Sequence, residues 1–112
     1  MIHAARLSRR ALLVAAASAS ALPARAAPAT LRADPAAMER AITDRTMMMV
    51  GSAPSYAHGV VDPIEELAAV AASRGLLMHV DCCVGGMYLP WARRLGDAIP
   101  AFDFSVPGVT QI

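Results

Sequence analysis

An apolar run ends in a single carboxylate within the segment His79-Val80-Asp81-Cys82-Cys83-Val84-Gly85-Gly86. The run starts at Leu76-Leu77-Met78, and together these residues predict a short buried strand over residues 76–80. Asp81 follows directly, where that strand would stop. Ligands bind parallel α/β sheets at the carboxyl ends of the strands. We therefore expect Asp81 to lie at the edge of a site.

A second buried strand is predicted upstream, over residues 46–50. Its sequence, Thr46-Met47-Met48-Met49-Val50, is apolar at successive positions, as in a strand of a parallel sheet covered on both faces. A long loop over residues 51–61 follows it and carries several polar side chains: Ser52, Ser55, Tyr56 and His58.

A helix is predicted between the two strands. Asp62 is a candidate N-cap, Pro63 suits the first helical position, and Glu65 is placed as in a capping box. A buried stripe with i, i+3, i+4, i+7 spacing follows, and Gly75 suits a left-handed residue after the helix. The stripe consists of Ile64, Leu67, Ala68 and Ala71.

Strand, helix and strand in this order predict a right-handed βαβ unit, the mark of an α/β fold with a parallel sheet. The residue 51–61 loop and Asp81 would then be neighbours at one sheet edge. Two strands alone leave both edges of the sheet open. We therefore expect an incomplete α/β layer that is marginally stable by itself.

The flanking segments carry weaker signals. Asp34-Pro35 predicts the start of a helix that runs to about Ile42. Residues 87–96 suggest a turn and a short helix. Residues 102–106 could approach a further strand, and Pro107-Gly108 would turn the chain.

Composition limits the classes of function. A chain of 112 residues is at most one domain, and a net charge of +1 gives no electrostatic case for nucleic-acid binding. Adjacent Cys82 and Cys83 would make a strained disulfide and lack zinc-ligand spacing. We therefore expect reduced thiols, no metal site and a cytoplasmic protein.

Residues 1–28 differ from the rest and resemble an export signal. Arg6, Arg9 and Arg10 precede an apolar run, and Ala24-Arg25-Ala26 resembles a cleavage site. Ser8-Arg9-Arg10-Ala11-Leu12-Leu13 also resembles a twin-arginine motif, which makes export through residues 1–26 the alternative location. The run is too short for a stable membrane span. Chance Ala/Arg-rich sequence near a wrongly assigned start is the other explanation, and the enzyme-like residues 29–112 favour it.

Three segments in combination resemble the PLP (pyridoxal 5'-phosphate)-dependent group II decarboxylase family of the aspartate-aminotransferase fold, within it the sphingosine-1-phosphate lyase-like members. The first runs from Gly51-Ser52-Ala53-Pro54-Ser55-Tyr56-Ala57-His58-Gly59 through Val60-Val61-Asp62-Pro63-Ile64-Glu65-Glu66-Leu67. The others are residues 79–86 and Phe102-Asp103-Phe104-Ser105-Val106-Pro107-Gly108-Val109-Thr110. The resemblance implies that residues 29–112 are part of a PLP-transferase large domain.

The resemblance implies cofactor contacts for three residues. The carboxylate of Asp81 would pair with the protonated ring nitrogen of PLP, so that the ring can accept electrons from the substrate. Cys83 matches a small residue lying against the ring, and Ser52 could hydrogen-bond the cofactor. The alternatives are a turn aspartate, a buried small residue and a turn serine.

Three further residues are candidates for the substrate site. Tyr56 and His58 could line the entrance, although loop residues of this kind are equally often solvated. His79 shares a strand face with Asp81 by the period of two. A packed histidine with satisfied hydrogen bonds is the more common role for such a residue.

The family's Schiff-base lysine has no counterpart here, because the chain contains no lysine. Family members act on small molecules, here an amino acid or a phosphorylated amino alcohol, and form homodimers. The sequence thus predicts a fragment of a PLP-dependent carbon–carbon lyase or decarboxylase with no catalytic residue of its own. A non-catalytic remnant that pairs with a full-length homologue and a small exported protein are the alternatives.

Overall fold

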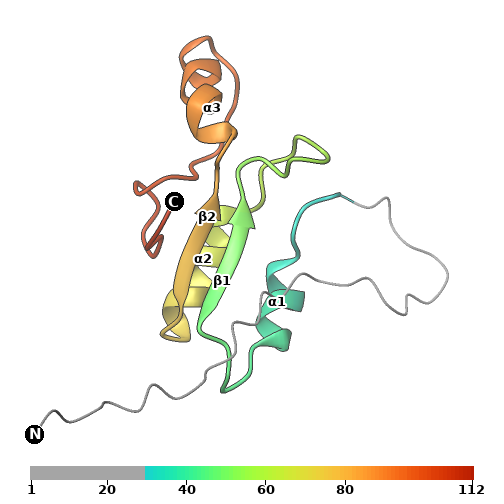
Figure 1. Ribbon diagram of the computed structural model, residues 1–112, viewed down its shortest axis with the longest axis vertical. Coiled ribbons are helices and arrows are strands. Elements are labelled where there is room, and N and C mark those ends of the chain that lie inside the picture. The colour runs from blue at the N-terminus through green and yellow to red at the C-terminus, as the bar shows by residue number, and fades with distance from the viewer. Residues whose placement is uncertain (1–29) are drawn as a thin grey trace, which may run out of the picture.

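The computed structural model describes residues 30–112 and shows two parallel strands with helices around them (Figure 1). The expected export signal and the domain boundary near residue 28 lie outside these residues. The elements, in chain order, are α1 (Pro35–Ala41), β1 (Met48–Ser52), α2 (Ile64–Ser73), β2 (Leu77–Asp81) and α3 (Gly85–Arg94).

β1 and β2 pair in parallel, and their register runs from Met48 opposite Leu77 to Ser52 opposite Asp81. The predicted βαβ unit is therefore confirmed. The predicted strand bounds were wrong by one or two residues. Ser52, predicted in the loop, and Asp81, predicted directly after its strand, are the last residues of their strands.

α2 covers one face of this sheet (Figure 1). The predicted stripe is buried and forms the core with alternate strand residues. The largest fully buried side chains are Ile64, Leu67, Met78 and Val80. The other face is more open, because Leu77 is 50% exposed and Met48 and Val50 are half-buried. The expectation of a sheet buried on both faces was therefore wrong for the described residues.

Gly51 lies within β1 and packs closely against α2. A Cβ atom at this position would lie 2.8 Å from Cδ1 of Ile64 and 2.9 Å from Cδ1 of Leu67. Glycine therefore lets α2 approach the strand closely. Sequence reasoning treated this glycine as the start of a loop, whereas here it is a packing residue within the strand.

The C-terminal end of α2 was predicted correctly, whereas its N-terminal cap was not. Gly75 has a φ of +64°, and the N–H of Leu76 donates to the carbonyl of Ala71, which completes the expected C-terminal motif. The N-cap position is Pro63, without a side-chain cap. The prediction that Asp62 caps this helix was wrong, because its carboxylate binds backbone N–H groups of two other segments.

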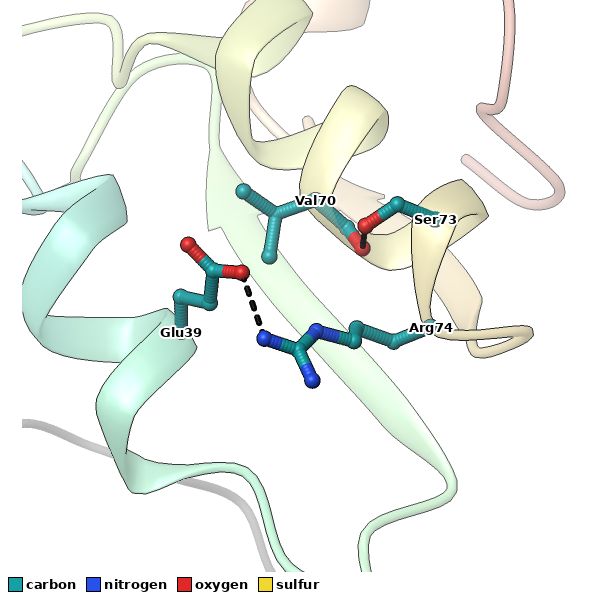
Figure 2. A network of polar contacts seen from close by, with 4 residues as sticks. All are labelled: Glu39, Val70, Ser73 and Arg74. Atoms are coloured by element: carbon teal, nitrogen blue, oxygen red, sulfur yellow. Dashed lines mark hydrogen bonds and ion pairs between the residues drawn. The ribbon is translucent and has the colours of Figure 1, made fainter.

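α1 begins as predicted. The side chain of Asp34 accepts hydrogen bonds from the N–H groups of Ala36 and Ala37. Arg74 after α2 donates to Glu39 of α1 at 2.7 Å, as Figure 2 shows. Both side chains are 40% or more exposed, so this ion pair contributes at most about 1 kcal/mol. The buried Met38 supplies the apolar contact of α1 with the core.

α3 starts two residues before the predicted turn and helix, at Gly85, and extends beyond the carboxyl ends of the strands (Figure 1). A Cβ atom at Gly85 would lie 1.8 Å from the carbonyl oxygen of Ala53. The absence of a side chain therefore lets the start of α3 lie directly against the end of β1.

The C-terminal segment contradicts two expectations. Residues 102–106 form turns, not a strand, with Phe102 and Val106 buried in the core. The free edge of β2 is partly covered, because Gln111 forms a parallel bridge with His79 and the N–H of Val80 donates to the carbonyl of Gln111. The hydroxyl of Thr110 accepts from the N–H of Met78 at 2.8 Å and donates to its carbonyl.

Candidate functional site

The site lies where β1 and β2 end side by side. Ser52 and Asp81 are register partners, and the N–H of Ala53 donates a 2.8 Å hydrogen bond to the carbonyl of Asp81. The register and this bond thus bring Ser52 and Asp81, which were predicted to belong to one site, to adjacent strand ends.

A hollow of about 350 Å³ opens beside Asp81. This volume falls within the range of small-molecule sites, about 300–1,000 Å³. It is lined by His79, Val80, Asp81, Cys82, Cys83 and Ile112. Three of the predicted site residues therefore meet here, and each belongs to β2 or to the turn that follows it.

The carboxylate of Asp81 is exposed at this hollow. Its Oδ1 accepts a long hydrogen bond, 3.3 Å, from the N–H of Cys83. Among the described residues no donor is recorded for Oδ2. One oxygen is thus oriented by the following turn, and the other is free to accept a bond from a protonated group.

His79 contributes an unusual feature. Its Nδ1 atom is buried and has no hydrogen-bond partner among the described residues. A buried polar atom without a partner carries a cost of about 1–3 kcal/mol. The prediction of a satisfied, packed histidine is wrong for this nitrogen.

The two cysteines differ in accessibility. Both are free thiols, Cys83 exposed and Cys82 half-buried. Burial, then the negative charge of Asp81, raises the pKa of the Cys82 thiol above its usual value. Cys82 therefore stays protonated at neutral pH. No group of three metal-ligating side chains occurs within residues 30–112.

The remaining candidates do not line the hollow. Tyr56 is 93% exposed and His58 is also exposed, both in the loop after β1. Ser52 is half-buried and adjoins Asp81 through the strand register, not through the hollow.

Sequence reasoning missed the placement of Asp62 and Thr110. Asp62 holds the end of β1, and the hydroxyl of Thr110 supplies hydrogen bonds to the free edge of β2. An Asp before a proline is typical of a helix cap, so the local sequence could not show that Asp62 binds other segments instead.

Comparison with known proteins gives consistent results. The chain is 58% identical over 81 residues to sphingosine-1-phosphate lyase of Arabidopsis thaliana and 45% identical over 85 residues to that of Dictyostelium discoideum. These matches cover 72% and 76% of the chain. The solved sphingosine-1-phosphate lyase of Burkholderia pseudomallei superposes on 75% of the chain with a TM-score of 0.71 and 46% identity.

The chain is a homologue of the sphingosine-1-phosphate lyases. The resemblance to the PLP-dependent group II decarboxylases is thereby confirmed, as is the partial α/β fold. L-aspartate decarboxylase of Thermococcus kodakarensis is a further relative, 47% identical over 67% of the chain.

The region shared with these lyases is a small part of them. The chain spans 15% of the Arabidopsis lyase, 20% of the Thermococcus decarboxylase and 19% of the Burkholderia structure. No family model matches it. Within residues 30–112, no helix combines the length and apolar character needed to cross a membrane.

Proposed function

We propose that this chain carries the ring-binding part of a PLP-dependent carbon–carbon lyase or decarboxylase site, with Asp81 as the counter-ion of the ring nitrogen. The observation that carries the proposal is the exposed Asp81 carboxylate at the hollow, with one oxygen oriented by Cys83 and the other without a recorded donor. Homology to sphingosine-1-phosphate lyases and an L-aspartate decarboxylase supports it.

The residues present fit one half of such a site. The hollow offers a carboxylate for the ring nitrogen and the small Cys83 side chain, and His79 also lines it. None of the residues that line it is an arginine or a lysine, so the phosphate has no guanidinium or ammonium partner there. The fit is therefore to the ring and not to the phosphate.

Each of these residues has a simple task. Bound PLP supplies an electron sink for bond cleavage at the substrate α-carbon. The Asp81 carboxylate keeps a proton on the ring nitrogen by Coulombic attraction and hydrogen bonding. The N–H of Cys83 orients that carboxylate. Ser52 lies at the end of the neighbouring strand as the register partner of Asp81, outside the lining of the hollow.

Covalent attachment of PLP to a lysine side chain cannot occur within this chain, since its sequence has no lysine. We therefore propose that the chain is inactive alone, and that its ancestral substrate was an amino acid or a phosphorylated amino alcohol. We place it in the cytoplasm, in keeping with its free thiols, with export through residues 1–26 as the alternative.

A non-catalytic role is the second candidate. α3 exposes large apolar side chains, Met87 at 79%, Trp91 at 61% and Leu95 at 87%. Such a surface favours association with a full-length homologue, in keeping with the homodimers that the family resemblance implies. Co-purification with that homologue would support the role, and its failure at micromolar concentrations of both proteins would remove it.

The proposed cofactor role is tested by titrating the full chain with pyridoxamine 5'-phosphate, which needs no lysine to bind. Only part of the site is present, so we expect a dissociation constant on the order of 1 mM. Backbone NMR signals of residues 79–83 should shift in a saturable manner. Asp81→Asn should abolish the shifts, with Asp97→Asn on the surface as the matched control. Equal shifts in the wild type and Asp81→Asn would refute the proposal.

A further inference from the structure

Asp62 is a buried carboxylate that no part of the proposed site chemistry uses. It is 9% exposed and precedes Pro63, the N-cap residue of α2. Its Oδ1 accepts a 2.8 Å hydrogen bond from the N–H of Ala33, and its Oδ2 accepts one of 2.8 Å from the N–H of Ser52. The two donors come from segments that are far from each other in the sequence.

The same residue also binds Ser52 through its backbone. The N–H of Asp62 donates to the carbonyl of Ser52 at 2.9 Å. Both the N–H and the carbonyl of Ser52 are therefore bonded to residue 62. Ala53, which follows Ser52, donates its N–H across to β2, to the carbonyl of Asp81.

We infer that Asp62 is a positioning residue that fixes the end of β1 against Asp81. The inference rests on the proposed function, because a fixed position of Asp81 matters only if its carboxylate binds a ligand. The path runs from the Asp62 carboxylate to the backbone of Ser52, and then through Ala53 to the strand end that carries the Asp81 side chain. Asp62 touches no ligand itself.

The two hydrogen bonds to Asp62 require a side chain with two acceptor atoms. Both partners are N–H donors, so both oxygens must accept. Asparagine has one oxygen and one NH₂ group, and the NH₂ group would face an N–H donor. Asparagine is thus a poor replacement here, although it matches aspartate in shape.

The test compares Asp62→Asn and Asp62→Ala with the wild-type full chain, and uses Asp44→Asn in an exposed turn as the matched control. Amide hydrogen exchange is measured at Ala33, Ser52, Met78 and Val80, and pyridoxamine 5'-phosphate is titrated as above. We expect both Asp62 variants to speed exchange at Ala33 and Ser52 while Met78 and Val80 stay protected. Ligand affinity should fall about fivefold, the equivalent of one hydrogen bond. Asp44→Asn should match the wild type in every measurement.

Two outcomes overturn the inference alone: unchanged exchange at Ala33 and Ser52 in both variants, or ligand affinity equal to that of the wild type. A wild-type chain that binds no ligand at Asp81 refutes the proposed function instead, which separates the two failures. If the variants do not fold, amide hydrogen exchange in the wild-type chain tests the inference. Ala33 and Ser52 must then exchange as slowly as Val80, and fast exchange at either one contradicts the inference.

Discussion

Ser52 and Asp81 stand opposite each other at the ends of β1 and β2, joined through the 2.8 Å hydrogen bond from the N–H of Ala53 to the carbonyl of Asp81. This relationship brings a hydroxyl and a carboxylate from distant parts of the sequence to one sheet edge.

The first prediction concerns the contact between α3 and β1. Gly85→Ala places a Cβ atom 1.8 Å from the carbonyl oxygen of Ala53, and the backbone must move to relieve the clash. We expect a loss of about 1–3 kcal/mol in the free energy of unfolding, measured by urea denaturation. The neighbouring Gly86→Ala is the control, since its Cβ would meet only Cys82, at 3.4 Å from Sγ and 4.0 Å from Cβ. That variant should gain up to about 1 kcal/mol from helix propensity, and equal stability of the two variants would contradict the packing described.

The second prediction concerns the contact between β1 and α2. Gly51→Ala should cost about 1–3 kcal/mol, because the new Cβ atom meets Cδ1 of Ile64 at 2.8 Å. Ile64→Val removes that Cδ1 atom and alone should cost about 0.5–1.5 kcal/mol. The double variant should lose less stability than the sum of the two, by about 0.5 kcal/mol or more. Simple additivity in denaturant melts would mean that the two side chains do not meet.

The third prediction concerns the edge of β2. Thr110→Val removes the hydroxyl that accepts from the N–H of Met78. The loss of this partner should cost about 1–3 kcal/mol and speed amide exchange at Met78. Thr110→Ser keeps the hydroxyl and should retain slow exchange. If Met78 exchanges equally in both variants, residues 110–111 do not dock on β2.

The fourth prediction concerns thiol reactivity. The thiolate is the reactive form, and the raised pKa of Cys82 keeps its thiol protonated at neutral pH. Iodoacetamide should therefore modify Cys83 in Cys82→Ser faster than it modifies Cys82 in Cys83→Ser. The rate at Cys82 should rise steeply as the pH is increased above neutral.

The same chemistry tests the placement of Asp81. Its negative charge is the second cause of the raised Cys82 pKa, after burial. Asp81→Asn should therefore lower that pKa and speed alkylation of Cys82 in the Cys83→Ser background. An unchanged rate profile against pH would show that the carboxylate is not close to the thiol.

The sequence predicts the parts of this fold that depend on local pattern. The spacing of Ile64, Leu67, Ala68 and Ala71 determines which face of α2 is buried, and the structure confirms it. Asp34 and Gly75 also act as predicted, because a cap and a left-handed turn depend only on neighbouring residues. Asp81 at the end of a strand follows from the apolar run before it.

The remaining features depend on contacts between distant residues. Gly51 is a packing residue within β1 because α2 lies directly against it. The Asp62 carboxylate does not cap α2, because it accepts hydrogen bonds from the N–H groups of Ala33 and Ser52 instead. The role of Thr110 likewise depends on the free edge of β2. None of these partners can be identified from spacing within a short window.

The most direct test of the Asp81 assignment is the protonation state of a bound ring nitrogen. Pyridoxamine 5'-phosphate labelled with ¹⁵N in the ring is added to excess full chain, and its ¹⁵N NMR shift is followed against pH. We predict that the bound nitrogen keeps its proton at a pH where the free molecule has lost it, and that Asp81→Asn removes this difference. A ring nitrogen that titrates identically when free, with the wild type and with Asp81→Asn would contradict the assignment.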